Sequence, residues 1–229
     1  AHIGSYDMHK EDICFLGQED NFSYRISSSY QHSHGYRKNS FYKSLDLGSR
    51  FSFMLNDLSL DFTQGFHKAS YGLPGALSEA DLQTRSRRDT KYPRDHAKQK
   101  DYYFVWDIAK DIFGQGQLSV NSSFRRRQTF TNFIDANAGW NPIYKSEINT
   151  VGVCPKCILK EGIWGLDNQL ILGFDFYLSD YSNDNYDLSS ILQNFTDINK
   201  TSWGYYFQDR VNIEENLLLT FGFRWERAK

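Results

Sequence analysis

The stretch TSWGYYFQDRVNIEENLLLTFGFRWERAK, at residues 201–229, sorts its side chains into two kinds by alternate position. One set is apolar and aromatic: Trp203, Tyr205, Phe207, Leu217, Leu219, Phe221, Phe223 and Trp225. The residues between them are polar or small: Gly204, Gln208, Arg210, Thr220, Gly222, Arg224 and Glu226. Successive side chains of a β-strand point to opposite faces. The stretch therefore predicts two strands that present one apolar face and one polar face.

The same alternation recurs along the rest of the chain. It is clear at 169–179, where Leu170, Leu172, Phe174, Phe176 and Leu178 alternate with Gln169, Gly173, Asp175 and Ser179. The other segments that show it, some of them weakly, are 3–15, 22–31, 44–55, 58–67, 102–110, 117–127 and 146–164. With the final pair, the pattern predicts about ten strands.

The connections between these segments alternate between short and long. The short ones contain Gly, Asn or Asp, as hairpin turns require, and lie at 16–20, 55–57, 113–116, 165–168 and 213–216. The long ones lie at 32–40, 68–100, 132–146 and 180–201. Residues 78–100 are almost wholly polar and are expected to form a mobile loop. This rhythm predicts an antiparallel meander with every short turn at the same end.

The composition helps to decide whether each face contacts water, lipid or another part of the protein. Aromatic residues make up 17% of the 229 residues, and the sequence holds no apolar run long enough for a transmembrane helix. The formal net charge of −2 gives no reason to expect a nucleic-acid partner. A soluble β-sandwich also alternates, but its core could not bury the charge on the polar face. An all-β transmembrane antiparallel β-barrel is therefore favoured over the sandwich.

Particular motifs carry a family resemblance. In the final pair, Tyr206, Gln208 and Asp209 stand on the first strand, and Gly222, Arg224 and Trp225 on the second. Further motifs are GSYD at 4–7, HGYRKNS at 34–40, YGLPGAL at 71–77 and NQLILGFDF at 168–176. Together they resemble successive barrel segments of TonB-dependent outer-membrane receptors.

The resemblance implies a barrel of roughly 22 strands with a plugged lumen. Residues 1–229 would then be a partial barrel domain that does not close on itself, with the plug domain and remaining strands absent. Short turns would face the periplasm and long loops the outside of the bacterial cell.

The implied function is energised uptake of a scarce nutrient, such as a ferric siderophore, haem or cobalamin, across the outer membrane. The implied partners are membrane lipid and lipopolysaccharide, a small-molecule or metal-chelate ligand, the remaining barrel strands, and a TonB-type energy-transducing protein that contacts the plug. Two alternatives stay open, a passive outer-membrane porin and a non-transporting adhesin-like or scaffold barrel.

Candidate ligand-binding residues lie on the polar face and beside the long connections. By parity, Arg125 and Arg127 point into the lumen while Arg126 points away. They would attract an anionic ligand or, as the favoured reading, pair with carboxylates of the wall or plug. Aromatic residues placed to stack on a ligand are Tyr71, Trp140, Tyr144, Tyr181 and Tyr186.

A cluster of loop cations has two readings. It comprises Arg85, Arg87, Arg88, Lys91 and Arg94, interleaved with Asp81, Asp89 and Asp95. These cations could contact lipopolysaccharide or ligand. The acidic residues among them favour an ordinary solvated loop.

The cysteines and histidines predict no metal site and no cofactor. Cys154 and Cys157 have C-x-x-C spacing but lack the second pair that zinc requires, so a local disulfide is favoured, with unpaired thiols next. His32 and His34 are too few for a metal centre. No catalytic array is recognisable, and the chain is expected not to be an enzyme.

Overall fold

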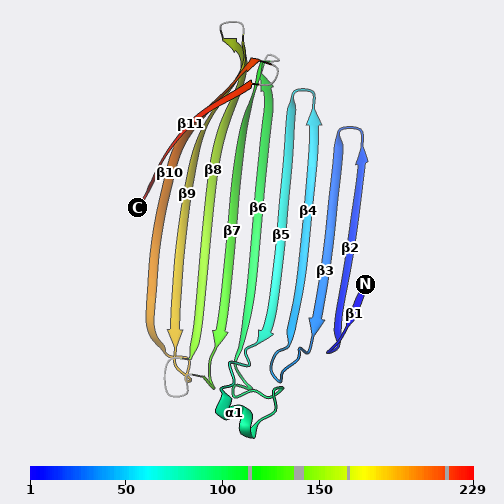
Figure 1. Cartoon of the computed structure of the whole chain (residues 1–229), viewed down its shortest axis with the longest axis vertical. Helices are drawn as coiled ribbons and strands as arrows, with labels where there is room; N and C mark the ends of the chain where they lie inside the picture. Colours follow the sequence, from blue (N-terminus) through cyan, green and yellow to red (C-terminus); the bar gives the residue numbers. More distant parts are fainter. Residues whose placement is uncertain (113–114, 137–141, 164–165, 215–216) are drawn as a thin grey trace.

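The computed structural model describes residues 1–112, 115–136, 142–163, 166–214 and 217–229. Within these ranges the chain forms one antiparallel sheet whose strands follow one another in sequence order (Figure 1). The strands are β1 (His2–Gly4), β2 (Met8–Glu19), β3 (Phe22–Ser33), β4 (Tyr42–Leu55), β5 (Leu58–Gly72), β6 (His96–Ile112), β7 (Gly116–Asn132), β8 (Ile143–Ile163), β9 (Leu166–Tyr186), β10 (Leu192–Glu214) and β11 (Leu217–Ala228). One short helix, α1 (Glu79–Thr84), lies in the connection between β5 and β6.

The predicted meander is confirmed, with two corrections to its boundaries. The segment at 3–15 is divided between β1 and β2, so the described sheet has eleven strands. Residues 180–201 were expected to be a connection, but most of them belong to β9 and β10, which pair from Leu192↔Tyr186 onward. Both faces of this part carry mostly polar side chains, with Phe195 on the outward face and Ile198 on the lumenal face as exceptions, so regular apolar alternation ends while the backbone ladder continues.

The register separates two faces, because residues directly opposite in an antiparallel ladder share a face. Phe174 pairs with Tyr205, and Phe207 with Phe223. These residues belong to what we call the outward face. Asp175, one residue along from Phe174, pairs with Gly204 on the opposite, lumenal face. The predicted parity of 169–179 and 203–225 is therefore present in the sheet.

The described residues have no conventional hydrophobic core. The buried hydrophobic residues among them are Ala69 and Ala97 alone. Large apolar side chains on the outward face stay exposed, with Leu172 at 42% and Phe221 at 63%. In the part of the chain that is described there is no second sheet to cover them. No described helix has the length and apolarity to cross a membrane.

Glycine–tyrosine pairs tighten the lumenal face. Gly173 pairs directly with Tyr206, and a Cβ added at Gly173 would lie 2.1 Å from the tyrosine ring. Gly152 and Tyr177 are also paired, and an added Cβ would come within 2.6 Å of that ring. The rings cover bare backbone where a larger residue would not fit, an arrangement known to pin strand register.

Candidate functional site

The candidate site lies on the lumenal face where β6 to β9 approach the long connections. Arg125 and Arg127 on β7 both bind the Asp101 carboxylate of β6. Arg125 Nη2 donates to Asp101 Oδ2 over 2.6 Å, and Arg127 Nε donates to the same oxygen over 3.1 Å. The Asp101 side chain is 7% exposed, whereas the arginine side chains are 52% and 40% exposed. Two cations share one carboxylate, so the cluster keeps a positive charge accessible to the lumen.

The structure contains the pairing that the sequence favoured for these arginines, and Asp101 is the partner that the sequence did not name. Asp101 lies before the segment recognised as a strand, 102–110. Counting parity back from Tyr103 would have placed it on the lumenal face. Arg126 faces outward, as expected, and binds Glu147 over 2.8 Å.

Tyr181 lies in the same lumenal row as the arginine cluster. Arg127 pairs with Ile148, and Ile148 pairs with Tyr181. Two strand spacings separate Arg127 from Tyr181, which is about 10 Å. A guanidinium and an aromatic ring at this separation can contact the two ends of one small anionic ligand.

The other predicted aromatic residues are not all brought to this row. Tyr71 and Tyr144 lie at strand ends on the lumenal side, where Tyr71 pairs with Tyr42 and the Tyr144 ring packs edge-on against Phe133. Tyr186 has the opposite parity, faces outward and donates to Asp184 over 3.1 Å. Trp140 lies outside the described residues. Ligand contact by any of them remains a prediction.

The long connections are tied together above the lumen. Asn39 Nδ2 donates to the carbonyls of Tyr92 and Asp95 over 2.6 and 2.7 Å. The Asp95 carboxylate, on a residue only 1% exposed, accepts the backbone N–H groups of Asp135 and Ala136. Residues 34–41, 73–95 and 133–136 thus form a hydrogen-bonded cap. Residues 78–100, predicted to be a mobile loop, contain α1, part of this cap and the start of β6.

Several of the loop cations act within this cap. Arg94 binds Asp135 over 2.5 Å, and this hydrogen bond holds the pKa of Asp135 below its ordinary value. Lys91 binds Asp81 at the start of α1 over 3.2 Å. Arg88 stacks over the rings of Tyr6 and Tyr36. These three cations therefore help to order the long connections.

The predicted disulfide is absent. Cys154 and Cys157 are both free thiols on β8. Residues three apart in a strand point to opposite faces, about 10 Å apart along the chain, so the two sulfurs cannot meet. The Cys154 thiol faces the lumen and donates to the Tyr177 hydroxyl over 3.2 Å. The disulfide prediction rested on the C-x-x-C spacing, and the irregular pattern at 146–164 did not reveal that both cysteines lie on one extended strand.

A histidine cluster was only half visible in the sequence. Asp7 accepts from His9 Nε2 over 2.8 Å and lies 3.4 Å from His34 Nδ1 and 3.9 Å from His32 Nδ1. The hydrogen bond from His9 is the main cause that lowers the pKa of Asp7. In the described ranges, no group of His, Cys, Asp or Glu has a geometry that could hold a metal ion.

Comparison with solved structures places this geometry in a known fold. The unliganded ferric citrate transporter FecA superposes with a TM-score of 0.85 at 17% identity, covering 98% of this chain and 35% of that one. FpvA of P. aeruginosa, bound to a pyoverdine–iron complex, gives 0.83 at 16% identity, covering 99% and 36%. The ferric-catecholate import receptor Fiu of E. coli K12, in its open form, gives 0.79 at 13% identity, covering 99% and 43%.

The chain has the fold of part of an outer-membrane receptor barrel. It spans about a third of the length of the first solved receptors that it matches. No protein-family model matches the sequence. No curated protein matches it significantly either. The receptor-barrel fold explains why the outward face is apolar without a covering layer and why the lumenal face holds paired charges.

Proposed function

We propose that the chain forms part of the barrel wall of a TonB-dependent receptor in the bacterial outer membrane, and that the whole receptor imports an iron–siderophore complex. The observation that carries this proposal is the match of nearly the whole chain to three solved structures: FecA, a ferric citrate transporter, Fiu, a ferric-catecholate import receptor, and FpvA, which is bound to a pyoverdine–iron complex. Haem and cobalamin belong to the same class of scarce nutrients and remain alternative cargoes.

The lumenal chemistry supports a ligand that carries negative charge. The Arg125–Arg127–Asp101 cluster has two guanidiniums for one carboxylate, and both arginine side chains are substantially exposed. Iron chelates built on carboxylate or catecholate oxygens present anionic edges that guanidinium recognises through paired hydrogen bonds. Tyr181, two strand spacings from Arg127 in the same lumenal row, offers an aromatic face to the same ligand.

The proposal includes partners outside this chain. Strand edges in hydrocarbon would leave unpaired N–H and C=O groups, each of which costs several kcal/mol. In this account further strands of the receptor pair with β2 and β11, a plug fills the lumen, and an energy-transducing protein of the TonB type acts on the plug. The chain's role is transport and not catalysis.

Uptake of radioactive iron tests the proposal in the host bacterium. Cells with and without the gene receive ferric citrate, a ferric catecholate and a ferric pyoverdine at limiting concentration. We expect deletion to abolish uptake of at least one complex, and removal of the proton-motive force to abolish the same uptake. Uptake that persists without energy would indicate a porin. Unchanged uptake of every complex, haem and cobalamin included, would indicate a non-transporting barrel.

A further inference from the structure

Three polar side chains stand within the band of apolar side chains on the outward face, which we call the apolar belt. They are Ser28 on β3, Ser49 on β4 and Gln64 on β5. Ser49 and Gln64 stand directly opposite each other in the β4–β5 ladder, and Ser28 pairs with Leu47. We call Ser28, Ser49 and Gln64 the polar notch.

The register places the polar notch on the lipid side of the sheet. Gln64 stands opposite Phe104 on β6, and Phe104 stands opposite Phe124 on β7. Phe124 is two residues from the outward Arg126, so the two side chains share a face. The Gln64 amide therefore points away from the lumen and lies among aromatic side chains.

Gln64 lies too deep in the apolar belt to reach water. Lys68, the first charged outward residue above it on β5, follows it by four residues. This separation is about 13 Å along the strand, or about 10 Å along the membrane normal at a tilt of about 40°. Between the two, Phe66 packs against Tyr102 with ring centroids 5.0 Å apart. A glutamine side chain is too short to pass these rings.

The polar notch has no hydrogen-bond partner in the part of the chain that is described. The side chains of Ser28 and Gln64 form no hydrogen bond there, and Ser49 Oγ is buried without a partner. On the lumenal face of the same strands, by contrast, Arg50 and Ser52 both donate to the Asp61 carboxylate. An amide without a partner is unfavourable in hydrocarbon, so polar residues within a membrane mark contacts with other polar groups.

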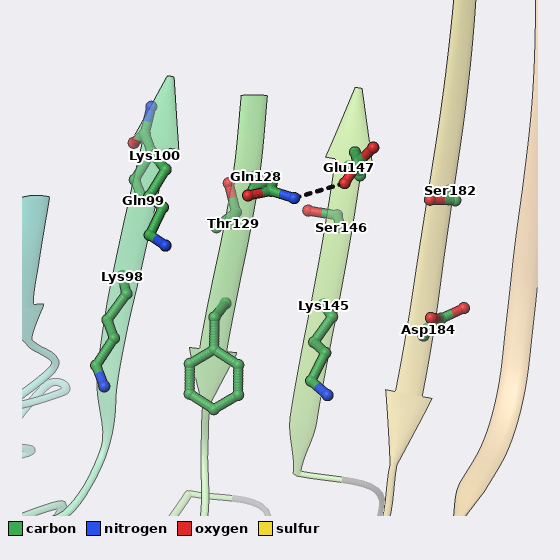
Figure 2. Close-up of a pocket in the computed structure, with 11 residues that line it drawn as sticks. Lys98, Gln99, Lys100, Gln128, Thr129, Lys145, Ser146, Glu147, Ser182 and Asp184 are labelled. Carbon is green, nitrogen blue, oxygen red and sulfur yellow. Dashed lines mark hydrogen bonds between the residues drawn. The ribbon is translucent and has the colours of Figure 1, made fainter. Parts of the chain in front are cut away.

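The outward glutamine of β7 shows what a satisfied amide looks like on this face. Gln128 Nε2 donates to Glu147 Oε2 over 2.7 Å, and Arg126 Nη2 donates to the same oxygen over 2.8 Å (Figure 2). Gln128 lies four residues before the end of β7, close to the long connections. The sheet therefore pairs an outward amide near water and leaves the one within the belt open to a partner.

The shape of the outward face at Gln64 is a hollow beside a ridge. The polar notch lines a hollow of about 460 Å³, together with apolar side chains such as Ile26 and Leu47. At the edge of the hollow, β6 carries the outward Phe104 and Trp106, which are 37% and 53% exposed. The hollow over β3 and β4 and the aromatic ridge of β6 thus lie on either side of Gln64.

This arrangement is self-complementary, which favours a second copy of the receptor as the occupant. Two copies inserted in the same direction form a closed pair about a two-fold axis along the membrane normal. With the axis at Gln64, the hollow of one copy faces the β6 ridge of its partner. Two Gln64 amides then meet at the axis, where each both donates and accepts a hydrogen bond. Acyl chains offer no polar group at this depth.

We propose that the receptor forms a two-fold dimer in the outer membrane through the polar notch. Gln64 of each copy binds Gln64 of the other across the axis, and each β6 ridge fills the opposite hollow. Hydrogen bonds between polar side chains of membrane-spanning segments stabilise their association. This interface lies on the other face of the sheet from the lumenal ligand site, and it leaves the edges of β2 and β11 free to pair within one barrel.

Counting the photobleaching steps of single receptor particles in lipid vesicles tests the proposal. The complete receptor carries one fluorophore per chain and is diluted stepwise with lipid. Gln64→Leu removes the amide, and Ser49→Leu fills the hollow, while both substitutions present an apolar side chain to lipid. The matched control is Gln128→Leu, the same change on the outward face outside the interface.

We expect two bleaching steps for the unaltered receptor, more often than random co-occupancy of vesicles gives, and one step after sufficient dilution. Gln64→Leu and Ser49→Leu should become monomeric at least about tenfold earlier in the dilution series, whereas the control should follow the unaltered receptor. A single step at every dilution, equal weakening in the control, or dimers that neither interface variant weakens would overturn the proposal.

The stability of the monomer separates loss of the contact from misfolding. At the highest dilution, urea unfolding should show Gln64→Leu to be at least as stable as the unaltered receptor, because leucine suits lipid and an unpaired amide does not. A less stable Gln64→Leu monomer would mean that the amide is satisfied within its own barrel, contrary to the proposal. Iron uptake is measured separately, so a monomeric receptor leaves the transport proposal intact.

Discussion

The two faces of the same strands are held by different forces. On β9, the outward Leu172 and Phe174 remain exposed and pack only against neighbouring strands, whereas the lumenal Gly173 receives the Tyr206 ring and Asp175 binds Arg224 over 2.9 Å. The outward side chains have to be apolar because they contact the surrounding solvent, whereas the lumenal side chains have to fit and pair with one another. One residue of displacement along a strand therefore changes what a substitution costs.

The largest expected effect comes from charging the outward face. Leu172→Arg should destabilise the membrane-inserted barrel by about 2–4 kcal/mol, because the guanidinium would lie near the middle of the apolar belt. The matched control is Ile171→Arg, an isomeric side chain one residue away that pairs with Gln208 on the lumenal face. Urea unfolding in lipid vesicles measures both. Equal costs at the two positions would mean that the faces do not differ in solvent.

A second effect concerns steric fit on the lumenal face. Gly173→Ala should cost about 1–3 kcal/mol, since the new methyl group would overlap the Tyr206 ring. The control is Gly222→Ala, where the nearest atom to the added Cβ is 3.4 Å away. In a double-mutant cycle, Gly173→Ala should cost much less in the Tyr206→Ala background, because the ring that the new methyl group overlaps is gone. If no coupling is measured, the ring does not cover this glycine.

A third effect tests the charge balance of the lumen. Asp101→Asn should cost about 1–2 kcal/mol, because Arg125 and Arg127 would lose the carboxylate that accepts their hydrogen bonds. Replacing both arginines with Gln in the same protein should recover part of that loss. Chemical denaturation of the unaltered protein and the two variants measures the difference, and a cost that the triple variant does not reduce would show that Asp101 acts through another contact.

The smallest expected effect is a loss of local stability in the cap as the pH falls. Hydrogen bonds from Ser78 lower the pKa of Asp81 to about 2. A carboxyl group whose pKa is lower in the folded than in the unfolded chain stabilises the folded form at pH values above its unfolded pKa. The contribution of Asp81 is therefore complete above about pH 4 and is lost as the pH falls toward 2. Hydrogen exchange of residues 79–84, corrected for intrinsic rates, should rise over that window. The rise should vanish in Asp81→Ala, and persistence there would assign it to another group.

Much of the fold could be predicted from the sequence, because a strand with lipid on one face and water on the other alternates apolar and polar side chains with a period of two. Residues 169–179 and 217–225 place apolar side chains on one face in both the pattern and the structure. The ends of β9 and β10 were missed because beyond the apolar belt both faces contact water and the contrast disappears. Tyr186 illustrates the consequence, since extending the strand would have given its outward parity.

The candidate site was only partly readable for the same reason. The lumenal parity of Arg125 and Arg127 follows from the strand itself, but their partner Asp101 lies outside the recognised segment. Contacts between connections, such as Asn39 with Asp95, join residues far apart in sequence and leave no periodic signal. The cysteines were misjudged because the pattern at 146–164 is irregular, which concealed an extended strand at Cys154 and Cys157.

The claim that the two faces of one sheet contact different solvents is tested most directly by a spin-label scan of β9. Single cysteines are placed at each position from 168 to 178 in a receptor whose Cys14, Cys154 and Cys157 are replaced by Ser, and the protein is studied in outer-membrane vesicles. Collision rates with oxygen, which concentrates in lipid, are compared with those of a water-soluble nickel chelate. The account predicts a period of two with opposite phase, oxygen highest at 170, 172, 174, 176 and 178. Contact with the nickel chelate at those same positions, or no alternation, would contradict it.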